Sequence, residues 1–307
     1  MRHWETEHPS WANGAELNEI IRHPKFLQAG EAERASFMLR SAQAKYDSEI
    51  AYPWDTYFGT SLKPLLQGKR VMDLGSLYGG RTVAWAESYE LQHITGIDVD
   101  PIYVATATQF AQTKGVSADF RVAFGEALPF ANVSFDAILS FDVLEHVQSP
   151  GATLKECHRV LKQGGYLCVV FPSFWQPIEH HLSLVTRAPG LQFIFSGKTL
   201  VEAYNRVLAS RGEDAAWYRR SHEGLRPWER CNTINGTTLA AFRKMVKGGG
   251  WSVVKHSRPP IGSIGRTVER EPRLWHRALS VLAKSVAHLP FFEEFLLHRN
   301  VFILQRS

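Results

Sequence analysis

Residues 70–172 alternate strand patterns with helix patterns, and this alternation constrains the fold more than any other feature of the chain. Five runs are predicted to be strands, and the first, fourth and fifth are apolar almost throughout: Arg70–Leu74, His93–Asp98, Asp119–Val122, Ala137–Phe141 and Gly165–Phe171. Strands that alternate with helices form a parallel sheet with helices on both faces. We therefore predict an α/β fold whose central strands are buried on both sides.

The chain divides into four parts by pattern. Residues 1–68 carry helical patterns and are predicted to form an N-terminal helical cap on a core at 69–172. Residues 173–234 are rich in proline and aromatic residues, so we predict an inserted lid there. Residues 235–307 are predicted to complete the core, with an amphipathic helical insertion at 266–297. The elements predicted in the last two parts are the helices Thr199–Arg211 and Thr237–Val246 and the strands Trp251–His256 and Asn300–Gln305.

The composition is that of an ordinary globular protein, with 44% hydrophobic and 21% charged residues. Cys157, Cys168 and Cys231 have no metal-type or disulfide spacing, which favours a reducing compartment. The first residues lack the apolar core of a secretory signal, and no apolar run approaches the roughly 20 residues of a spanning helix. We therefore expect a cytoplasmic protein. The net charge of +5 permits an anionic partner without requiring one, and nucleic acid is not expected.

The first predicted strand leads into a glycine turn at residues 75–80, with the sequence Gly-Ser-Leu-Tyr-Gly-Gly. Gly75 lets a ligand approach the backbone closely, and the N–H groups at the start of the next helix can face that ligand. The turn lacks the second glycine of the Gly-x-Gly-x-x-Gly pattern, which a bound pyrophosphate needs. The pattern therefore disfavours a dinucleotide.

Asp98 ends the second predicted strand. A carboxylate at this position can accept hydrogen bonds from both hydroxyls of a ribose. A NAD-dependent dehydrogenase would need the same acid. Asp98 therefore indicates a nucleoside more firmly than it indicates any particular cofactor.

In this order and spacing, the segments resemble the class I S-adenosylmethionine-dependent methyltransferases across most of the nucleotide-binding core. The resemblance implies a Rossmann-like seven-stranded sheet of six parallel strands and one antiparallel strand, with the last strand between its neighbours. It implies S-adenosyl-L-methionine as the cofactor, with Asp73 placed to attract the cationic end of its methionine part. The implied cofactor contacts are Asp73, Gly75, Ser76, Leu77, Gly79, Asp98, Val99, Phe124, Gly125, Glu126, Phe141 and Asp142.

One segment departs from the family pattern. The family usually has Asp-Ala after the third strand, with the Asp on the adenine amino group, whereas this chain has Phe124-Gly125. Phe124 could stack on the adenine, and the backbone of Gly125 or Glu126 could supply the polar contacts.

Three histidines are candidate proton acceptors, because histidine titrates near neutral pH. His180 and His181 lie in the predicted lid, and His146 follows the fourth strand, where it is predicted to start a helix with Glu145. Surface or packing roles remain open for each of them. Two adjacent histidines are a poor ligand set for one metal ion, so no metal is expected.

The predicted function is methyl transfer to the hydroxyl of a small-molecule metabolite or natural product, because an aromatic lid suits an enclosed apolar ligand. Three alternatives remain open: an RNA methyltransferase, a lipid or quinone methyltransferase at a membrane surface, and a non-catalytic binding protein that keeps the cofactor fold. Peripheral membrane contact and a homodimer are compatible with the sequence.

Overall fold

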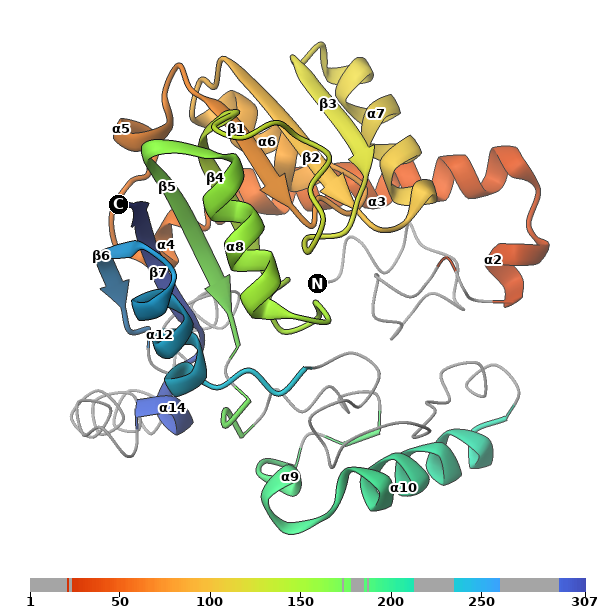
Figure 1. The fold of residues 1–307 in the computed structure, drawn as a ribbon. Helices are drawn as coiled ribbons and strands as arrows, with labels where there is room; N and C mark the ends of the chain where they lie inside the picture. The colour runs from red at the N-terminus through yellow and green to blue at the C-terminus, as the bar shows by residue number, and fades with distance from the viewer. Residues whose placement is uncertain are drawn as a thin grey trace, which may run out of the picture.

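The computed structural model describes residues 21, 24–172, 174–177, 185–186, 188–212, 235–259 and 293–307. A seven-stranded sheet lies at its centre, in the order β3-β2-β1-β4-β5-β7-β6 (Figure 1). The strands are β1 (Arg70–Leu74), β2 (His93–Asp98), β3 (Ala118–Val122), β4 (Phe135–Phe141), β5 (Leu161–Phe171), β6 (Trp251–Ser257) and β7 (Asn300–Arg306). Six strands are parallel, and β7 runs antiparallel to both neighbours, β5 and β6. The predicted fold class is confirmed.

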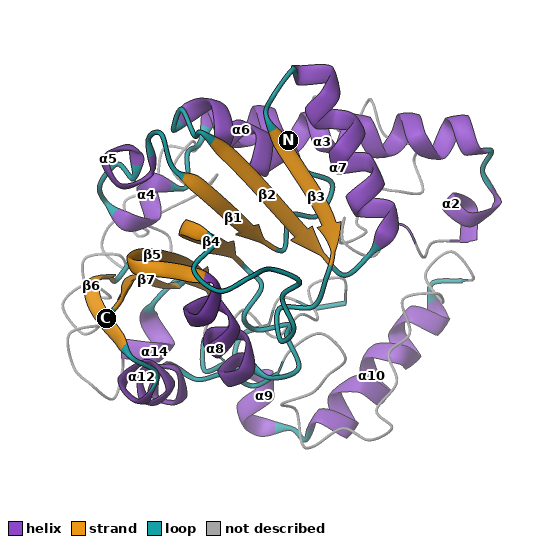
Figure 2. Ribbon diagram, turned by 45° about the horizontal axis from the view of Figure 1, so that its top comes forward, coloured by secondary structure: helices purple, strands orange, loops and turns teal. Residues whose placement is uncertain are grey.

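Helices cover both faces of this sheet (Figure 2). They are α2 (Pro24–Gln28), α3 (Glu31–Ala51), α4 (Asp55–Phe58), α5 (Lys63–Leu66), α6 (Gly80–Ser88), α7 (Pro101–Lys114), α8 (Pro150–Val160), α9 (Leu191–Ile194), α10 (Gly197–Ser210), α12 (Leu239–Gly248) and α14 (Glu293–Leu296). Residues of α8 and α12 pack on one face, and residues of α4 and α6 pack on the other. The long helix α3 lies outside the sheet, against α6 and α7.

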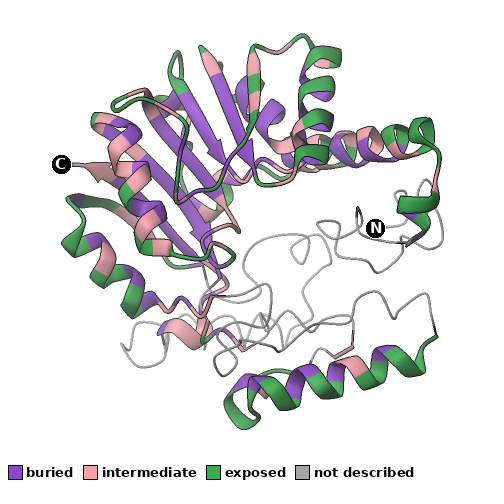
Figure 3. Cartoon of the chain, turned by 45° about the vertical axis from the view of Figure 1, so that its right-hand side comes forward, coloured by how far each residue is buried: buried purple, intermediate pink, exposed green. Residues whose placement is uncertain are grey.

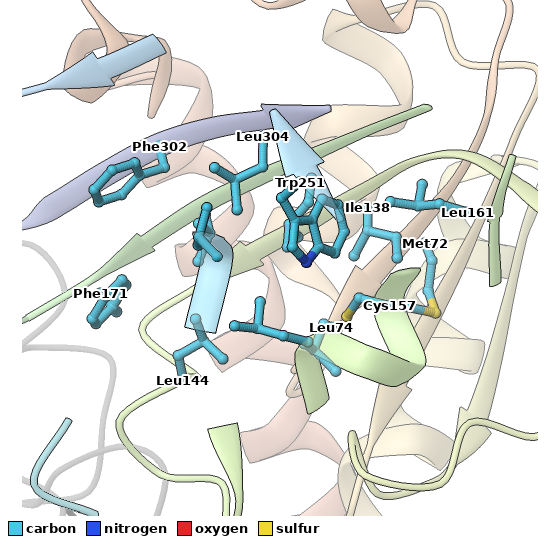
Figure 4. Packing of buried hydrophobic residues seen from close by; sticks show 14 of the residues in the cluster. Met72, Leu74, Ile138, Leu144, Cys157, Leu161, Phe171, Trp251, Phe302 and Leu304 are labelled. Atoms are coloured by element: carbon cyan, nitrogen blue, oxygen red, sulfur yellow. The ribbon is translucent and has the colours of Figure 1, made fainter. Parts of the chain in front are cut away.

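The largest core lies between the sheet and helices α8 and α12 (Figure 4). Met72, Ile138 and Phe302 point into it from three different strands, and Cys157 joins them from α8. The central strands are buried nearly throughout, whereas the outer sides of the helices are exposed (Figure 3). Burial on both faces explains why β1, β4 and β5 are apolar almost throughout.

Side-chain caps determine where several helices begin. Asp100, Ser149, Ser196 and Thr238 each accept a hydrogen bond from a backbone N–H in the first turn of α7, α8, α10 and α12, respectively. Because Thr238 is a cap, α12 starts at Leu239, two residues later than predicted. A cap of this kind satisfies a backbone donor that would otherwise have no partner.

Glu145 and His146 do not start a helix, and that prediction is wrong. They lie in a turn after β4, and the next helix, α8, begins at Pro150. Asn235 binds this turn from far along the chain, because its amide Nδ2 donates to the carbonyls of Leu144 and Val147 at 2.6 and 2.7 Å. These long-range bonds satisfy carbonyls that a helix would have satisfied locally.

Several predictions fall on residues outside the described part of the chain. They include most of the insertion predicted at 266–297, much of the predicted lid, and the start of the N-terminal helical patterns. Of the predicted lid, α9 and α10 are described, and they lie on the side of the sheet where the parallel strands end (Figures 1 and 2). Open α/β sheets bind their ligands on this side. The proposed domain boundaries stay a prediction.

Candidate functional site

Asp73 is a buried carboxylate near the end of β1. It is 3% exposed and accepts a hydrogen bond from the Thr82 hydroxyl of α6 at 2.5 Å. Burial raises the pKa of Asp73 from 3.8 to about 7, although the Thr82 bond and the nearby Arg81 charge oppose that rise. With a pKa near neutral, the Asp73 carboxyl group is favoured in its ionised form when a cation lies beside it.

The glycine turn after β1 is held tightly against the end of β2. The N–H groups of Gly75 and Ser76 both donate to the Ile97 carbonyl at 2.9 Å. Gly75 has φ of 84°, and a β-carbon there would overlap the side chain of Val143. The glycine is therefore needed for packing against the β4 turn as well as for the backbone conformation. The helix α6 begins only at Gly80, with Gly79 as its cap.

Asp98 joins the glycine turn to the end of β2. It is 8% exposed, and its two carboxylate oxygens accept N–H groups from Leu77 at 2.9 Å and Asp100 at 3.1 Å. Leu77 has a positive φ of 46°, so this bond holds a backbone conformation that few residues adopt unaided. Burial raises the pKa of Asp98, and the backbone bonds counteract that effect. A carboxylate accepts about four hydrogen bonds, so Asp98 keeps acceptor capacity beyond its backbone bonds.

A pocket opens between this turn and α6, at the carboxyl ends of β1 and β4. It is lined by Lys45, Asp73, Gly75, Ser76, Leu77, Tyr78, Gly80, Arg81, Trp85 and Phe141. Five of the residues implied by the resemblance therefore come together: Asp73, Gly75, Ser76, Leu77 and Phe141. Val99, by contrast, is 55% exposed on the surface beside Asp98.

Three charged residues of this region were not singled out from the sequence. Arg81 lies in the first turn of α6, with its guanidinium carbon 3.9 Å from the centre of the Phe141 ring. Its Nε donates to Glu49 of α3 at 3.0 Å, and Lys45 of the same helix also lines the pocket. Arg81 could have been suspected from its place directly after the glycine turn. Glu49 and Lys45 carry no signal in the sequence, because α3 reaches the pocket only through tertiary packing.

The segment after β3 is open on one side. Phe124 is 57% exposed, and Phe124 and Ala127 form an isolated bridge that makes the segment a tight turn. Gly125 is buried against Thr153 and Leu74, and the Glu126 side chain accepts the Ser149 N–H at 3.1 Å. An exposed ring over a tightly held turn leaves a face of Phe124 accessible to a ligand.

The turn after β4 carries Asp142, which the structure pairs with a residue that the sequence did not indicate. Arg299 Nε lies 2.9 Å from Asp142 Oδ1, and Arg299 directly precedes β7. His146 Nε2 lies 3.7 Å from a carboxylate oxygen of the buried Glu145 in the same turn. His180 and His181 lie outside the described residues.

An aromatic cluster connects the described lid residues to α14. Trp175 and Phe193 of the predicted lid and Phe295 of α14 have ring centres 5.4 to 6.0 Å apart. Trp175 is 38% exposed and Phe193 is 39% exposed.

Among the described residues, no helix is long and apolar enough to cross a membrane.

The strand order and the antiparallel β7 are those of the methyltransferase fold. Residues 72–169 match the family described as "Methyltransferase domain". Residues 72–169 thus carry a class I S-adenosylmethionine-dependent methyltransferase domain, and this domain family implies S-adenosyl-L-methionine as its cofactor.

The individual relatives match only about a third of the chain. The chain is 32% identical over 112 residues to "Ubiquinone biosynthesis O-methyltransferase" of Maricaulis maris, which is 36% of this chain and 43% of that protein. It is 35% identical over 105 residues to the protein of that name from Xylella fastidiosa, which is 34% of this chain and 42% of the relative. The chain thus spans less than half the length of these curated relatives.

A solved structure has a similar fold. The S-adenosylmethionine-dependent methyltransferase from Mesorhizobium loti superposes with a TM-score of 0.50 at 15% identity, over 79% of this chain and 93% of that chain. At this identity the likeness concerns the fold alone.

Proposed function

We propose that this protein transfers a methyl group from S-adenosylmethionine to a hydroxyl oxygen of a small, largely apolar molecule. The observation that carries the proposal is the buried Asp98, which holds the glycine turn through the Leu77 N–H and keeps capacity to accept further hydrogen bonds. In this role Asp98 binds the two ribose hydroxyls, and Asp73 attracts the methionine ammonium. Phe124 stacks on the adenine.

Methyl transfer depends mainly on how the protein positions the reacting groups. S-adenosylmethionine, when bound, supplies an electrophilic methyl group on a sulfonium. The pocket residues hold the reacting groups in line and exclude water, which lowers the barrier without a dedicated nucleophile. Phe141 and Trp85 provide apolar walls for that purpose. His146, His180 and His181 stay candidates for accepting the hydroxyl proton.

Two observations support a small, apolar acceptor. The Trp175, Phe193 and Phe295 cluster lies in and beside the segment that follows β5, where the substrates of open α/β sheets bind. The curated relatives are named O-methyltransferases of ubiquinone biosynthesis. Their names favour oxygen as the methylated atom.

A second candidate is an acceptor with a long apolar tail, reached at a membrane surface. Ile194 and Phe195 at the end of α9 are 73% and 46% exposed, beside the aromatic cluster. Exposed apolar side chains of this kind can contact a lipid surface. This candidate shares the same chemistry and differs only in where the acceptor is bound.

The test is an assay with S-adenosylmethionine carrying a labelled methyl group, against a panel of catechols, phenols and prenylated phenols. Label should enter at least one hydroxyl compound, and the analogue whose hydroxyl is already methylated should take none. An Asp98→Ala variant is the control for contaminating activity. Label that appears only in amines or in RNA would contradict the proposed acceptor class. Acceptance of prenylated phenols alone, with stimulation by vesicles, would favour the second candidate.

A further inference from the structure

Glu49 is a buried carboxylate outside the family's sequence motifs. It is 7% exposed and belongs to α3, yet it holds three donors from other parts of the fold. Its Oε1 accepts the Trp54 N–H at 2.8 Å and the Trp85 indole N–H at 2.9 Å, and its Oε2 accepts Arg81 Nε at 3.0 Å. Burying a carboxylate is costly unless its oxygens are bonded in this way. Glu49 therefore fixes α3 to α6 at one defined position.

The contact between these two helices is close enough to depend on a glycine. A β-carbon at Gly80 would overlap the Ala42 carbonyl of α3. Gly80 also lines the pocket, as do Lys45 of α3 and Arg81 of α6. Helix α3 thus forms part of the pocket wall.

Arg81 is oriented from two sides. Glu49 holds its Nε, and the guanidinium lies over the Phe141 ring at the pocket. Within the described part of the chain, its two terminal NH2 groups have no hydrogen-bond partner, although the Arg81 side chain is only 18% exposed. A guanidinium whose Nε is fixed presents those NH2 groups in a planar geometry that suits a carboxylate.

The pocket therefore combines a buried acid, Asp73, with two basic residues, Arg81 and Lys45. This charge arrangement matches a zwitterionic amino-acid group, with the ammonium at Asp73 and the carboxylate at Arg81. We propose that Arg81 binds the carboxylate of the methionine part of the cofactor and that Glu49 is the positioning residue that aims it. This inference rests on the proposed function, because it concerns how the same cofactor is held.

The Glu49→Gln variant tests whether Glu49 orients the guanidinium of Arg81. The single amide oxygen can keep the bonds from Trp54 and Trp85. The amide NH2 then faces the N–H of Arg81, and two donors cannot bond to each other. The guanidinium is expected to leave its position even though it keeps its charge.

The experiment compares S-adenosylmethionine with decarboxylated S-adenosylmethionine, which keeps the adenosine, the sulfonium and the amine. Calorimetry gives the ratio of the two dissociation constants for each protein. The wild type should prefer the carboxylate-bearing ligand by about 10- to 100-fold, as expected for a hydrogen bond between charged groups. In Arg81→Gln and in Glu49→Gln the ratio should fall toward one, through weaker binding of S-adenosylmethionine alone.

Glu293 provides the matched control, because it is another 7% exposed carboxylate that pairs with an arginine, Arg243, at 2.8 Å. Glu293→Gln should lower the melting temperature without changing the ratio. A wild-type ratio near one, or an unchanged ratio in either Arg81→Gln or Glu49→Gln, would overturn the inference while leaving the proposed function intact. Failure of the wild type to bind either ligand would overturn both.

Discussion

Arg299 reaches across the end of β5 to pair with Asp142, with 2.9 Å between Nε and Oδ1. Asp142 follows β4 and Arg299 precedes β7, and β5 lies between these strands in the sheet. Arg299 also donates to the carbonyl of His298 at 3.0 Å. The pair thus lies at the carboxyl end of β4, beside Phe141, which lines the pocket between the glycine turn and α6.

Breaking this pair should destabilise the protein. Arg299→Met leaves the Asp142 carboxylate without its partner, and we expect unfolding to become easier by about 1–3 kcal/mol. Asp142→Asn is a suitable second change, because φ at this residue is 54° and Asn tolerates that region. In a double-mutant cycle measured by denaturant unfolding, the double variant should lose less than the sum of the single losses. Strict additivity would show that the two side chains do not interact in solution.

Phe124 should matter more for the cofactor than for folding. Its ring is 57% exposed, so Phe124→Ala removes little buried surface. We expect a melting temperature near that of the wild type without ligand and a smaller upward shift when S-adenosylhomocysteine is added. Equal losses with and without the ligand would identify Phe124 as a packing residue instead.

The central strands were predictable because burial on both faces makes their residues apolar. β1 and β2 have the predicted bounds, whereas β4 and β5 begin two and four residues earlier than predicted. The turn at Glu145 was not predictable, because Asn235, which holds it, lies 91 positions from Leu144.

The charged part of the candidate site was predictable only where a motif contains it. Asp73 and Asp98 stand at the ends of strands, a position that itself indicates function. Glu49 lies 32 positions from Arg81, and Arg299 lies 157 positions from Asp142. Partners that meet only through helix packing or sheet order leave no pattern in a single sequence.

Asp73 should make ligand affinity depend on pH. Its pKa is about 7 in the unliganded protein, and a neighbouring ammonium favours the ionised form. Affinity for S-adenosylhomocysteine should therefore rise as the pH increases toward about 7 and then level off. Calorimetry across this range should show the rise in the wild type and a flat, weaker profile in Asp73→Asn.

The same residue should set a trend in stability. Because the folded-state pKa lies above the unfolded value of 3.8, the native state binds the proton more strongly between these two values. The contribution of Asp73 to the stability of the unliganded protein should then fall as the pH rises from about 4 to about 7. Asp73→Asn keeps an acceptor for Thr82 and should remove part of that fall. Parallel profiles for the wild type and the variant would contradict the assignment.

Turnover rates of single variants can show which of the candidate histidines takes part in catalysis. Ala replacements of His146, His180 and His181 should each leave cofactor affinity intact. If a general base is used, at least one replacement should lower turnover by about 10²- to 10⁴-fold, most strongly at low pH, with an acceptor from the hydroxyl panel. Wild-type rates in all three variants would remove them from the mechanism.

The most direct test of the account is calorimetric binding of S-adenosylhomocysteine to the wild type and to Asp98→Ala. We expect one site in the wild type and a loss of about 1.5–3 kcal/mol in the variant, since bonds to a charged acceptor disappear. Asp119→Ala, at a strand carboxylate bonded to His93 at 3.0 Å, is the control and should bind normally. Absence of binding in the wild type, or equal affinity in Asp98→Ala, would contradict a cofactor site at the end of β2.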